Sequence, residues 1–160
     1  MSRPIALLLV GLPGSGKSTY RKNLSSSMVF EVASSDDYLD RKAEELGLTY
    51  NEVFKEFIKE ADGYFREKLM LAATRHEEII IDRTNMSVKS RAASINILRK
   101  THYIAAIVFN ISDEDLYINL YARPGKNIPY NIIEGMKHSF VMPTCSEGID
   151  YIETVNFTRN

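Results

Sequence analysis

The sequence has 160 residues, no tryptophan and one cysteine, Cys145. One cysteine cannot form a disulfide within the chain, so the fold must be stabilised by a hydrophobic core, for which this length is sufficient. Chains without disulfides are typical of reducing compartments, and we expect a cytoplasmic protein. The histidines His76, His102 and His138 lack metal-ligand spacing with one another or with Cys145, which argues against a zinc site.

Long hydrophobic runs and a strong excess of one charge are also missing. The longest apolar run, 5–10, is far shorter than the about 20 residues of a membrane-spanning helix, and its flanks lack signal-peptide features. We therefore expect no membrane segment. The net charge of −1 means that a polyanionic partner would have to be bound by a local group of basic residues. Length and the absence of linker-like segments predict one domain spanning 1–160.

A glycine-rich segment, Gly11-Leu12-Pro13-Gly14-Ser15-Gly16-Lys17-Ser18-Thr19, follows the apolar run and precedes a helical pattern. It matches the phosphate-binding loop (P-loop), in which backbone N–H groups and a helix N-terminus surround phosphate oxygens. Lys17 is predicted to reach the β- and γ-phosphates, and Ser18 to ligate Mg²⁺. A chance glycine turn is the alternative, which the flanking strand and helix disfavour. The predicted ATP-binding residues of this segment are Gly11, Pro13, Gly14, Ser15, Gly16, Lys17, Ser18 and Thr19.

Apolar segments and helical patterns alternate along the whole chain. Strands are predicted at 5–10, 28–33, 78–82, 103–109 and 149–155, and helices at 17–24, 50–75, 87–100, about 112–121 and 129–140. This alternation predicts an α/β protein with the P-loop NTPase fold: a mostly parallel sheet of four to five strands flanked by helices. Ligands of such sheets bind at the carboxyl ends of the strands.

Carboxylates follow two more predicted strands, so we expect them beside the P-loop. Asp36 and Asp37 come after strand 28–33, and we predict that Asp36 is a catalytic base, because a carboxylate near the γ-phosphate can accept the proton of an attacking hydroxyl group. Asp82 ends the next strand and resembles a Walker B acid, which predicts that it holds Mg²⁺ or its water. Helix capping and strand termination are the alternative roles.

The segment 122–128 interrupts the alternation with proline and glycine and is predicted to form a small lid. Arg123 in this lid is expected to close over the ATP phosphates and to stabilise the transferring phosphoryl group, with Lys126 as a weaker contact. A solvated surface arginine is the alternative. Three tyrosines are candidates for stacking on a base, although aromatic residues along a long helix more often pack in a core: Tyr38, Tyr50 and Tyr64.

Together these segments resemble the kinase domain of the 5′-hydroxyl polynucleotide kinases of the bacteriophage type, and the resemblance covers most of the chain. The P-loop is similar to the loop of that family, and Ser35-Asp36-Asp37-Tyr38 is similar to its aspartate motif. Asp82-Arg83-Thr84-Asn85 with Arg91 resembles its Asp-x-Thr-Asn segment, and 123–129 resembles its lid.

The resemblance implies transfer of the γ-phosphate of ATP to the 5′-hydroxyl end of DNA or RNA, with ATP and Mg²⁺ as cofactors. It implies that Asp36 is the base and Arg123 the lid arginine. The acceptor side would be lined by the remaining motif residues, which we predict to bind the substrate: Asp37, Arg83, Thr84 and Asn85.

One position departs from the resemblance. Leu39 stands where the bacteriophage enzyme has an arginine that helps to hold the nucleic acid, and Arg41, Lys42 or Arg83 are candidates to replace that contact. Two other functions also fit the motifs. A small-molecule kinase of the same superfamily would share the loop, the aspartate and the lid. A non-catalytic ATP-binding module would share the loop, but it would need neither a base nor a lid arginine.

Overall fold

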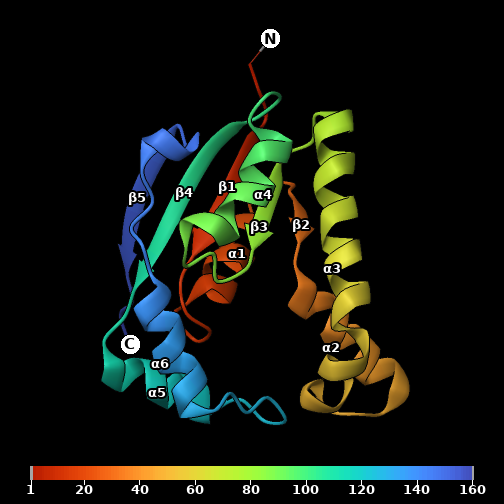
Figure 1. Cartoon of the computed structure of the whole chain (residues 1–160), viewed down its shortest axis with the longest axis vertical. Coiled ribbons are helices and arrows are strands. Elements are labelled where there is room, and N and C mark those ends of the chain that lie inside the picture. The colour runs from red at the N-terminus through yellow and green to blue at the C-terminus, as the bar shows by residue number, and fades with distance from the viewer. Residues whose placement is uncertain (1, 160) are drawn as a thin grey trace.

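The computed structural model describes residues 2–159 and contains a five-stranded sheet with helices on both faces (Figure 1). The strands lie in the order β2-β3-β1-β4-β5, and all neighbours are parallel. Their bounds are β1 Ile5–Val10, β2 Glu31–Ala33, β3 Ile79–Asp82, β4 Tyr103–Asn110 and β5 Tyr151–Asn156. The predicted α/β P-loop NTPase fold is confirmed. After β1 the chain builds β2 and β3 on one side of β1, and then crosses to build β4 and β5 on the other side. Sheets of this kind bind ligands at the carboxyl ends of the strands where the order reverses, which here is the end of β1.

The helices explain why β1 is apolar at every position. Helices α3 (Tyr50–Arg75) and α4 (Val88–Leu98) cover one face of the sheet, and α1 (Lys17–Ser25) covers the other. Leu8 of β1 is buried in the cluster that contains Phe65 of α3 and Ile95 of α4. Leu9 is buried in a second cluster, against which Tyr20 of α1 packs. A parallel strand covered on both faces has no solvent side on which polar residues could alternate.

Helix α2 (Ser35–Leu46) packs against the first half of α3, and Figure 1 shows the two side by side at one end of the molecule. Ser34 caps α2, because its hydroxyl oxygen accepts a hydrogen bond of 3.2 Å from the backbone N–H of Asp37. The N-cap of α2 is therefore Ser34, and neither Asp36 nor Asp37 caps this helix. Leu39 of α2 is fully buried in the contact with α3.

The second strand is shorter than predicted. The prediction spanned 28–33, but Met28 and Val29 are 45% and 92% exposed, and pairing with β3 begins at Glu31. Helix α4 is also shorter than its predicted range of 87–100. The remaining helices are α5 (Asp113–Tyr121) and α6 (Tyr130–Ser139), which flank the predicted lid. None of the described helices is long and apolar enough to cross a membrane.

Candidate functional site

The P-loop joins β1 to α1 at the carboxyl rim of the sheet, and its glycines are required by geometry. Gly14 and Gly16 have φ angles of 84° and 104°, which residues with a side chain rarely adopt. Gly11 is required for a different reason: a Cβ atom there would lie 2.6 Å from the Ser15 hydroxyl oxygen. The loop backbone is therefore held in a shape that leaves room for a ligand above it.

This loop provides a site for an anion. Gly16 occupies the N-cap of α1 and has no side chain to accept a hydrogen bond, so the first N–H groups of the helix remain available. A helix N-terminus of this kind favours phosphate. The Ser15 hydroxyl oxygen is buried and has no hydrogen-bond partner within residues 2–159. Available donors and an unpartnered hydroxyl group fit the polyphosphate of ATP.

The Lys17 ammonium group lies inside the loop. Its Nζ donates hydrogen bonds to the carbonyl oxygens of Gly11 at 2.6 Å and Leu12 at 3.0 Å. Burial lowers the pKa of Lys17 to about 8, against the opposing effect of the Asp82 and Asp36 carboxylates. A bound phosphate would stabilise the charged form and raise this pKa again.

A cavity of about 400 Å³ opens above the loop, and we call it the donor cavity. Most of the site residues predicted from the sequence line this cavity. Its wall includes both the P-loop and Arg123 of the lid segment. The predicted residues in its wall are Pro13, Gly14, Gly16, Lys17, Ser18, Thr19, Asp36, Asp37, Asp82, Arg83, Thr84, Arg123 and Lys126. Their assigned roles remain predictions, but the fold does bring them together.

Ser18 and Asp82, the predicted Mg²⁺ ligands, line this same cavity. Burial raises the pKa of the Asp82 carboxyl group, while Lys17 and Arg21 oppose that rise. Within residues 2–159 there is no cluster of three or more histidine, cysteine or acidic residues that could hold a metal ion. Mg²⁺ usually takes one or two protein oxygens together with phosphate oxygens and water, so this pair fits that ion.

Arg21 is a site residue that the sequence reasoning missed. Its guanidinium group bonds to Asp82 at 2.8 Å and to Asp37 at 3.0 Å, and thereby joins α1 to the end of β3 and to the first turn of α2. The available signal was its position one helical turn after Lys17, on the same face of α1. Asp37, predicted to bind the substrate, is held in this ion pair.

Asp36 lies in the first turn of α2 and is bonded through both carboxylate oxygens. Oδ1 accepts a hydrogen bond from the Tyr50 hydroxyl group at 2.6 Å, and Oδ2 accepts one from Lys126 Nζ at 3.1 Å. The surrounding protein alone would raise the pKa of Asp36, but the Lys126 ammonium group and the Tyr50 hydrogen bond lower it below its usual value. The side chain is 54% exposed and keeps lone pairs free for a further donor.

The predicted lid is placed against α3 through several contacts. Lys126 Nζ lies 4.1 Å from the centre of the Tyr50 ring, and the Asn127 carbonyl oxygen accepts a hydrogen bond of 3.0 Å from Asn51. Figure 1 shows the segment before α6 reaching toward the end of the molecule where α2 and α3 pack. The segment 122–128 therefore spans the site from α5 to the start of α3.

A second cavity of about 580 Å³ adjoins the first, and we call it the acceptor cavity. Its apolar wall comes from α3 and α6 and includes Tyr50, Phe54, Ile58, Ile132 and Met136. Six residues line both cavities: Pro13, Asp36, Asp82, Arg83, Thr84 and Lys126. Asp36 therefore stands at the boundary between the two spaces.

Asp82, Arg83 and Thr84 of the Asp-x-Thr-Asn segment all line both cavities. The Arg83 guanidinium group pairs with Asp62 at 2.5 Å, and its Nε donates to the Ser35 hydroxyl oxygen at 3.1 Å. It also lies 3.7 Å from the centre of the Phe65 ring. These contacts fix Arg83 in the wall of the acceptor cavity.

Asn85 was predicted to bind the substrate, but it lies in the protein interior and lines neither cavity. Its side chain is 1% exposed and donates a hydrogen bond of 2.7 Å to the Leu9 carbonyl oxygen. Arg91, which is fully buried, donates to the Asn85 carbonyl oxygen at 2.8 Å and pairs with Glu147 at 2.8 Å. These bonds tie the segment after β3 to β1 and to the region before β5, so Asn85 supports the rim from inside.

Residues far along the chain complete the donor cavity. Asn119 donates a hydrogen bond of 2.8 Å to the Gly14 carbonyl oxygen, and Phe157 lies beside Gly16. The Arg159 guanidinium carbon is 5.4 Å from the centre of the Phe157 ring. An aromatic ring at the edge of a phosphate loop offers a surface on which a base can stack. No motif in the sequence pointed to these residues.

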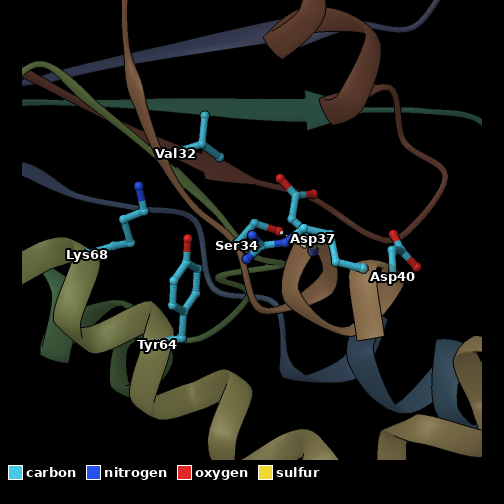
Figure 2. Close-up of a pocket in the computed structure, with 7 residues that line it drawn as sticks. Val32, Ser34, Asp37, Asp40, Tyr64 and Lys68 are labelled. Atoms are coloured by element: carbon cyan, nitrogen blue, oxygen red, sulfur yellow. Dashed lines mark hydrogen bonds between the residues drawn. The ribbon is translucent and has the colours of Figure 1, made fainter. Parts of the chain in front are cut away.

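A third cavity, of about 360 Å³, is lined by residues of β2, α2 and α3 and shares Ser34, Asp37 and Asp40 with the donor cavity (Figure 2). Figure 2 shows Asp37 and Asp40 on α2, and Tyr64 and Lys68 on α3 beside Val32 of β2. The ring of Tyr64 lies 5.2 Å from the ring of Tyr38, between the two helices. Of the three tyrosines considered for stacking, Tyr50 is the one in the acceptor wall.

Known proteins resemble this chain in sequence. The model of the AAA domain family (AAA_33) matches residues 7–143. The L-seryl-tRNA(Sec) kinase of Methanococcus maripaludis is 25% identical over 165 residues, and the alignment covers 94% of this chain. This chain spans 63% of the length of that kinase.

Solved structures resemble it in fold. A putative kinase from Chloroflexus aurantiacus superimposes with a TM-score of 0.75 at 16% identity, over 97% of this chain and 89% of that one. A chain of the Pnkp1/Rnl/Hen1 RNA repair complex superimposes with a TM-score of 0.66 at 24% identity, over 87% of this chain and 44% of that one. At these identities the likeness shows a shared α/β fold.

Proposed function

This chain belongs to the AAA domain family, and we propose that it is an ATP-dependent kinase that transfers the γ-phosphate of ATP to the 5′-hydroxyl end of DNA or RNA. One observation carries the proposal. Asp36 lies at the boundary of the donor and acceptor cavities, with both carboxylate oxygens hydrogen-bonded and its pKa below the usual value. A base in this position reaches a hydroxyl group on one side and a γ-phosphate on the other.

The donor half of the proposed reaction is carried by the loop and the lid. The N–H groups at the start of α1 and the Lys17 ammonium group bind the β- and γ-phosphates. Ser18 and Asp82 would hold Mg²⁺, which neutralises charge on the phosphates when bound. Arg123 in the cavity wall is placed to stabilise the charge of the transferring phosphoryl group.

The acceptor half is carried by Asp36. The hydroxyl oxygen attacks the γ-phosphorus, and its proton passes to the Asp36 carboxylate. The bond between the γ-phosphorus and the β–γ bridging oxygen breaks, and ADP leaves with that electron pair. Transfer is direct, so no phosphorylated residue of the chain is formed.

Two features support a nucleic acid end as the acceptor. The rings of Tyr50 and Phe54 are 5.9 Å apart in the acceptor wall and offer a surface for a base. Lys55, Arg83 and Lys126 line the same cavity and supply positive charge for a phosphodiester. The names of two similar proteins also refer to RNA, one as a seryl-tRNA kinase and one as part of an RNA repair complex.

A small-molecule acceptor is the second candidate, and the size of the acceptor cavity favours it. A volume of about 580 Å³ with a mostly apolar wall matches the usual dimensions of small-ligand sites. Two of the three cations in its wall are already paired, Arg83 with Asp62 and Lys126 with Asp36.

Label transfer from γ-³²P-ATP separates these candidates. The acceptors are a DNA and an RNA oligonucleotide with a 5′-hydroxyl end, a 3′-nucleotide, and a panel of sugars and small alcohols. The proposal predicts label on an oligonucleotide and none on the same oligonucleotide carrying a 5′-phosphate. Label only on a sugar or alcohol would favour the second candidate. ATP binding without transfer to any acceptor would reject a kinase.

A further inference from the structure

Tyr50 connects three parts of the site. Its hydroxyl group donates the 2.6 Å hydrogen bond to Asp36, its ring lies beneath the Lys126 ammonium group, and its side chain lines the acceptor cavity. It is the first residue of α3, whereas Asp36 lies on α2 and Lys126 on the lid segment. No motif in the sequence assigns it a role in phosphate transfer.

We propose that Tyr50 is a positioning residue of this kinase: its hydroxyl group orients the Asp36 carboxylate toward the acceptor cavity and holds it there while Lys126 turns to the phosphates of ATP. The inference rests on the proposed function, because it assigns Asp36 as the base. It goes beyond that function by naming the group that controls the base.

The Tyr50 side of this contact is rigid. Thr49 and Glu52 form a reciprocal capping box at the start of α3, with a hydrogen bond of 3.3 Å from the Glu52 N–H to the Thr49 hydroxyl oxygen. Leu39 of α2 and Val53 of α3 are fully buried in the same cluster, which fixes the two helices against each other. The bond between the Tyr50 hydroxyl group and Asp36 is therefore set by two packed helices.

The Lys126 side is adaptable. Lys126 lies on the lid and lines both cavities, and lysine is a point charge on a flexible stem. Its ammonium group can exchange Asp36 for a phosphate oxygen when ATP enters the donor cavity. At that moment Asp36 loses the charge that most strongly lowers its pKa, and the hydrogen bond from Tyr50 remains to favour the ionised form.

The Tyr50 hydroxyl group remains a donor throughout this exchange. Burial and the negative charge of Asp36 raise the pKa of Tyr50 above its ordinary value, so the hydroxyl group stays protonated across the working range of a kinase. Tyr50 is therefore the donor in this hydrogen bond, because an ionised Asp36 carboxylate has acceptors and no donor. Replacing tyrosine with phenylalanine removes this single bond and keeps the ring in the acceptor wall.

The experiment compares Tyr50→Phe with a matched control, Tyr38→Phe. The Tyr38 hydroxyl group also donates to a carboxylate, that of Glu60, but this bond is exposed and Tyr38 lies outside the residues that line the two cavities. We expect Tyr50→Phe to lower kcat about 10- to 100-fold, the range for a hydrogen bond to a charged group, and to leave the KM for ATP unchanged. Tyr38→Phe keeps the wild-type kcat, and both variants keep the wild-type Tm.

Two pH measurements distinguish orientation of the base from packing. The acid limb of the kcat profile moves to higher pH in Tyr50→Phe, because Asp36 loses a donor that favours its ionised form. In the ATP-free protein, the Asp36 carboxyl ¹³C signal, assigned with Asp36→Asn, titrates at higher pH in Tyr50→Phe than in the wild type. Neither change occurs in Tyr38→Phe.

The outcomes separate this inference from the proposed function. If Tyr50→Phe keeps the wild-type kcat and Asp36 titration while Asp36→Asn is inactive, the positioning role is wrong and the base assignment stands. If both phenylalanine variants lose activity equally, a general packing effect replaces the positioning role. If Asp36→Asn remains active, or if the wild type labels no acceptor, the proposed function fails, and the ¹³C titration still decides whether Tyr50 controls the carboxylate.

Discussion

The donor and acceptor cavities meet at Asp36 but are built in different ways. The donor cavity uses one continuous loop, whose backbone N–H groups and glycine φ angles create the anion site, and charged side chains line the rest. The acceptor cavity uses apolar side chains from α3 and α6, which are more than 70 residues apart in the sequence, and its other side is lined by the lid segment 122–128. The polyphosphate of ATP is bound by backbone groups that do not depend on the acceptor. The acceptor is selected by side chains.

This difference predicts that substitutions sort by location. Changes at the shared boundary should alter kcat, because the two substrates react there. Changes at aliphatic positions of the acceptor wall, such as Ile132, should alter only the KM for the acceptor. Changes beneath the loop should alter stability as well as activity, because the loop buries a charge.

The largest expected effect is at the lid. Arg123→Ala should lower kcat by about 10³ to 10⁵, the range measured for arginines that stabilise a transferring phosphoryl group. Arg123→Lys should restore only part of the rate, because lysine lacks the planar fork. The control Arg66→Ala removes an exposed arginine of α3 and should be silent. A loss smaller than tenfold in Arg123→Ala would mean that Arg123 is a solvated surface residue.

The second effect is at the boundary. Asp36→Asn should lower kcat by about 10² to 10⁴, the usual contribution of a general base, while the Kd for ATP stays within a few-fold of the wild type. Calorimetric titration with ATP and steady-state rates provide the two values. Glu56→Gln, on the exposed side of α3, is the matched carboxylate control. If Asp36→Asn keeps its rate, Asp37 becomes the next candidate.

The third effect should appear on the acceptor side alone. Ile132→Trp adds bulk to the acceptor cavity, and because Ile132 is 46% exposed the larger side chain should leave the core intact. We expect the KM for the acceptor to rise at least about tenfold, which corresponds to about 1.4 kcal/mol of binding free energy, with the KM for ATP unchanged. Ile118→Trp, at a position on α5 that is 47% exposed, is the control. Equal changes in both KM values would contradict two separate cavities.

The smallest effect is on stability. Burial lowers the pKa of Lys17 to about 8, so keeping this amine charged at neutral pH lowers the free energy of unfolding of the ATP-free protein. Lys17→Met should therefore raise the Tm of the ATP-free protein by a few degrees at pH 7.

The pH dependence gives the sign of this effect. Above pH 8 the folded wild type releases the Lys17 proton while the unfolded chain keeps it until about pH 10.4, so the wild type gains stability over this interval. The Tm advantage of Lys17→Met should shrink accordingly. A lower Tm for the variant at pH 7 would show that the hydrogen bonds from Lys17 to Gly11 and Leu12 outweigh the cost of burying the charge.

Much of the donor side was predictable because its information is local. The loop spacing predicted the strand, turn and helix in order, and the apolar periodicity of 50–75 predicted the bounds of α3 correctly. The helical pattern at about 112–121 predicted α5, where the Ser112 hydroxyl oxygen accepts a hydrogen bond of 3.2 Å from the backbone N–H of Asp115. In each case a few neighbouring residues contain the whole signal.

The parts that were missed depend on contacts between distant segments. Arg21 joins two carboxylates only after three elements converge, and Phe157 meets the loop only after β5 is in place. Asn85 looked like a site residue by its motif, but it is buried against β1. The apolar residues Met28 and Val29 predicted a longer strand, although the edge of the sheet leaves them in solvent.

Initial-velocity kinetics with ATP and the acceptor varied together test the central claim most directly, which is that two adjoining cavities allow direct transfer across Asp36. Double-reciprocal plots should give lines that intersect, because both substrates must be bound at once for the γ-phosphate to pass from one cavity to the other. Parallel lines, the mark of a phosphorylated enzyme intermediate, would contradict the account.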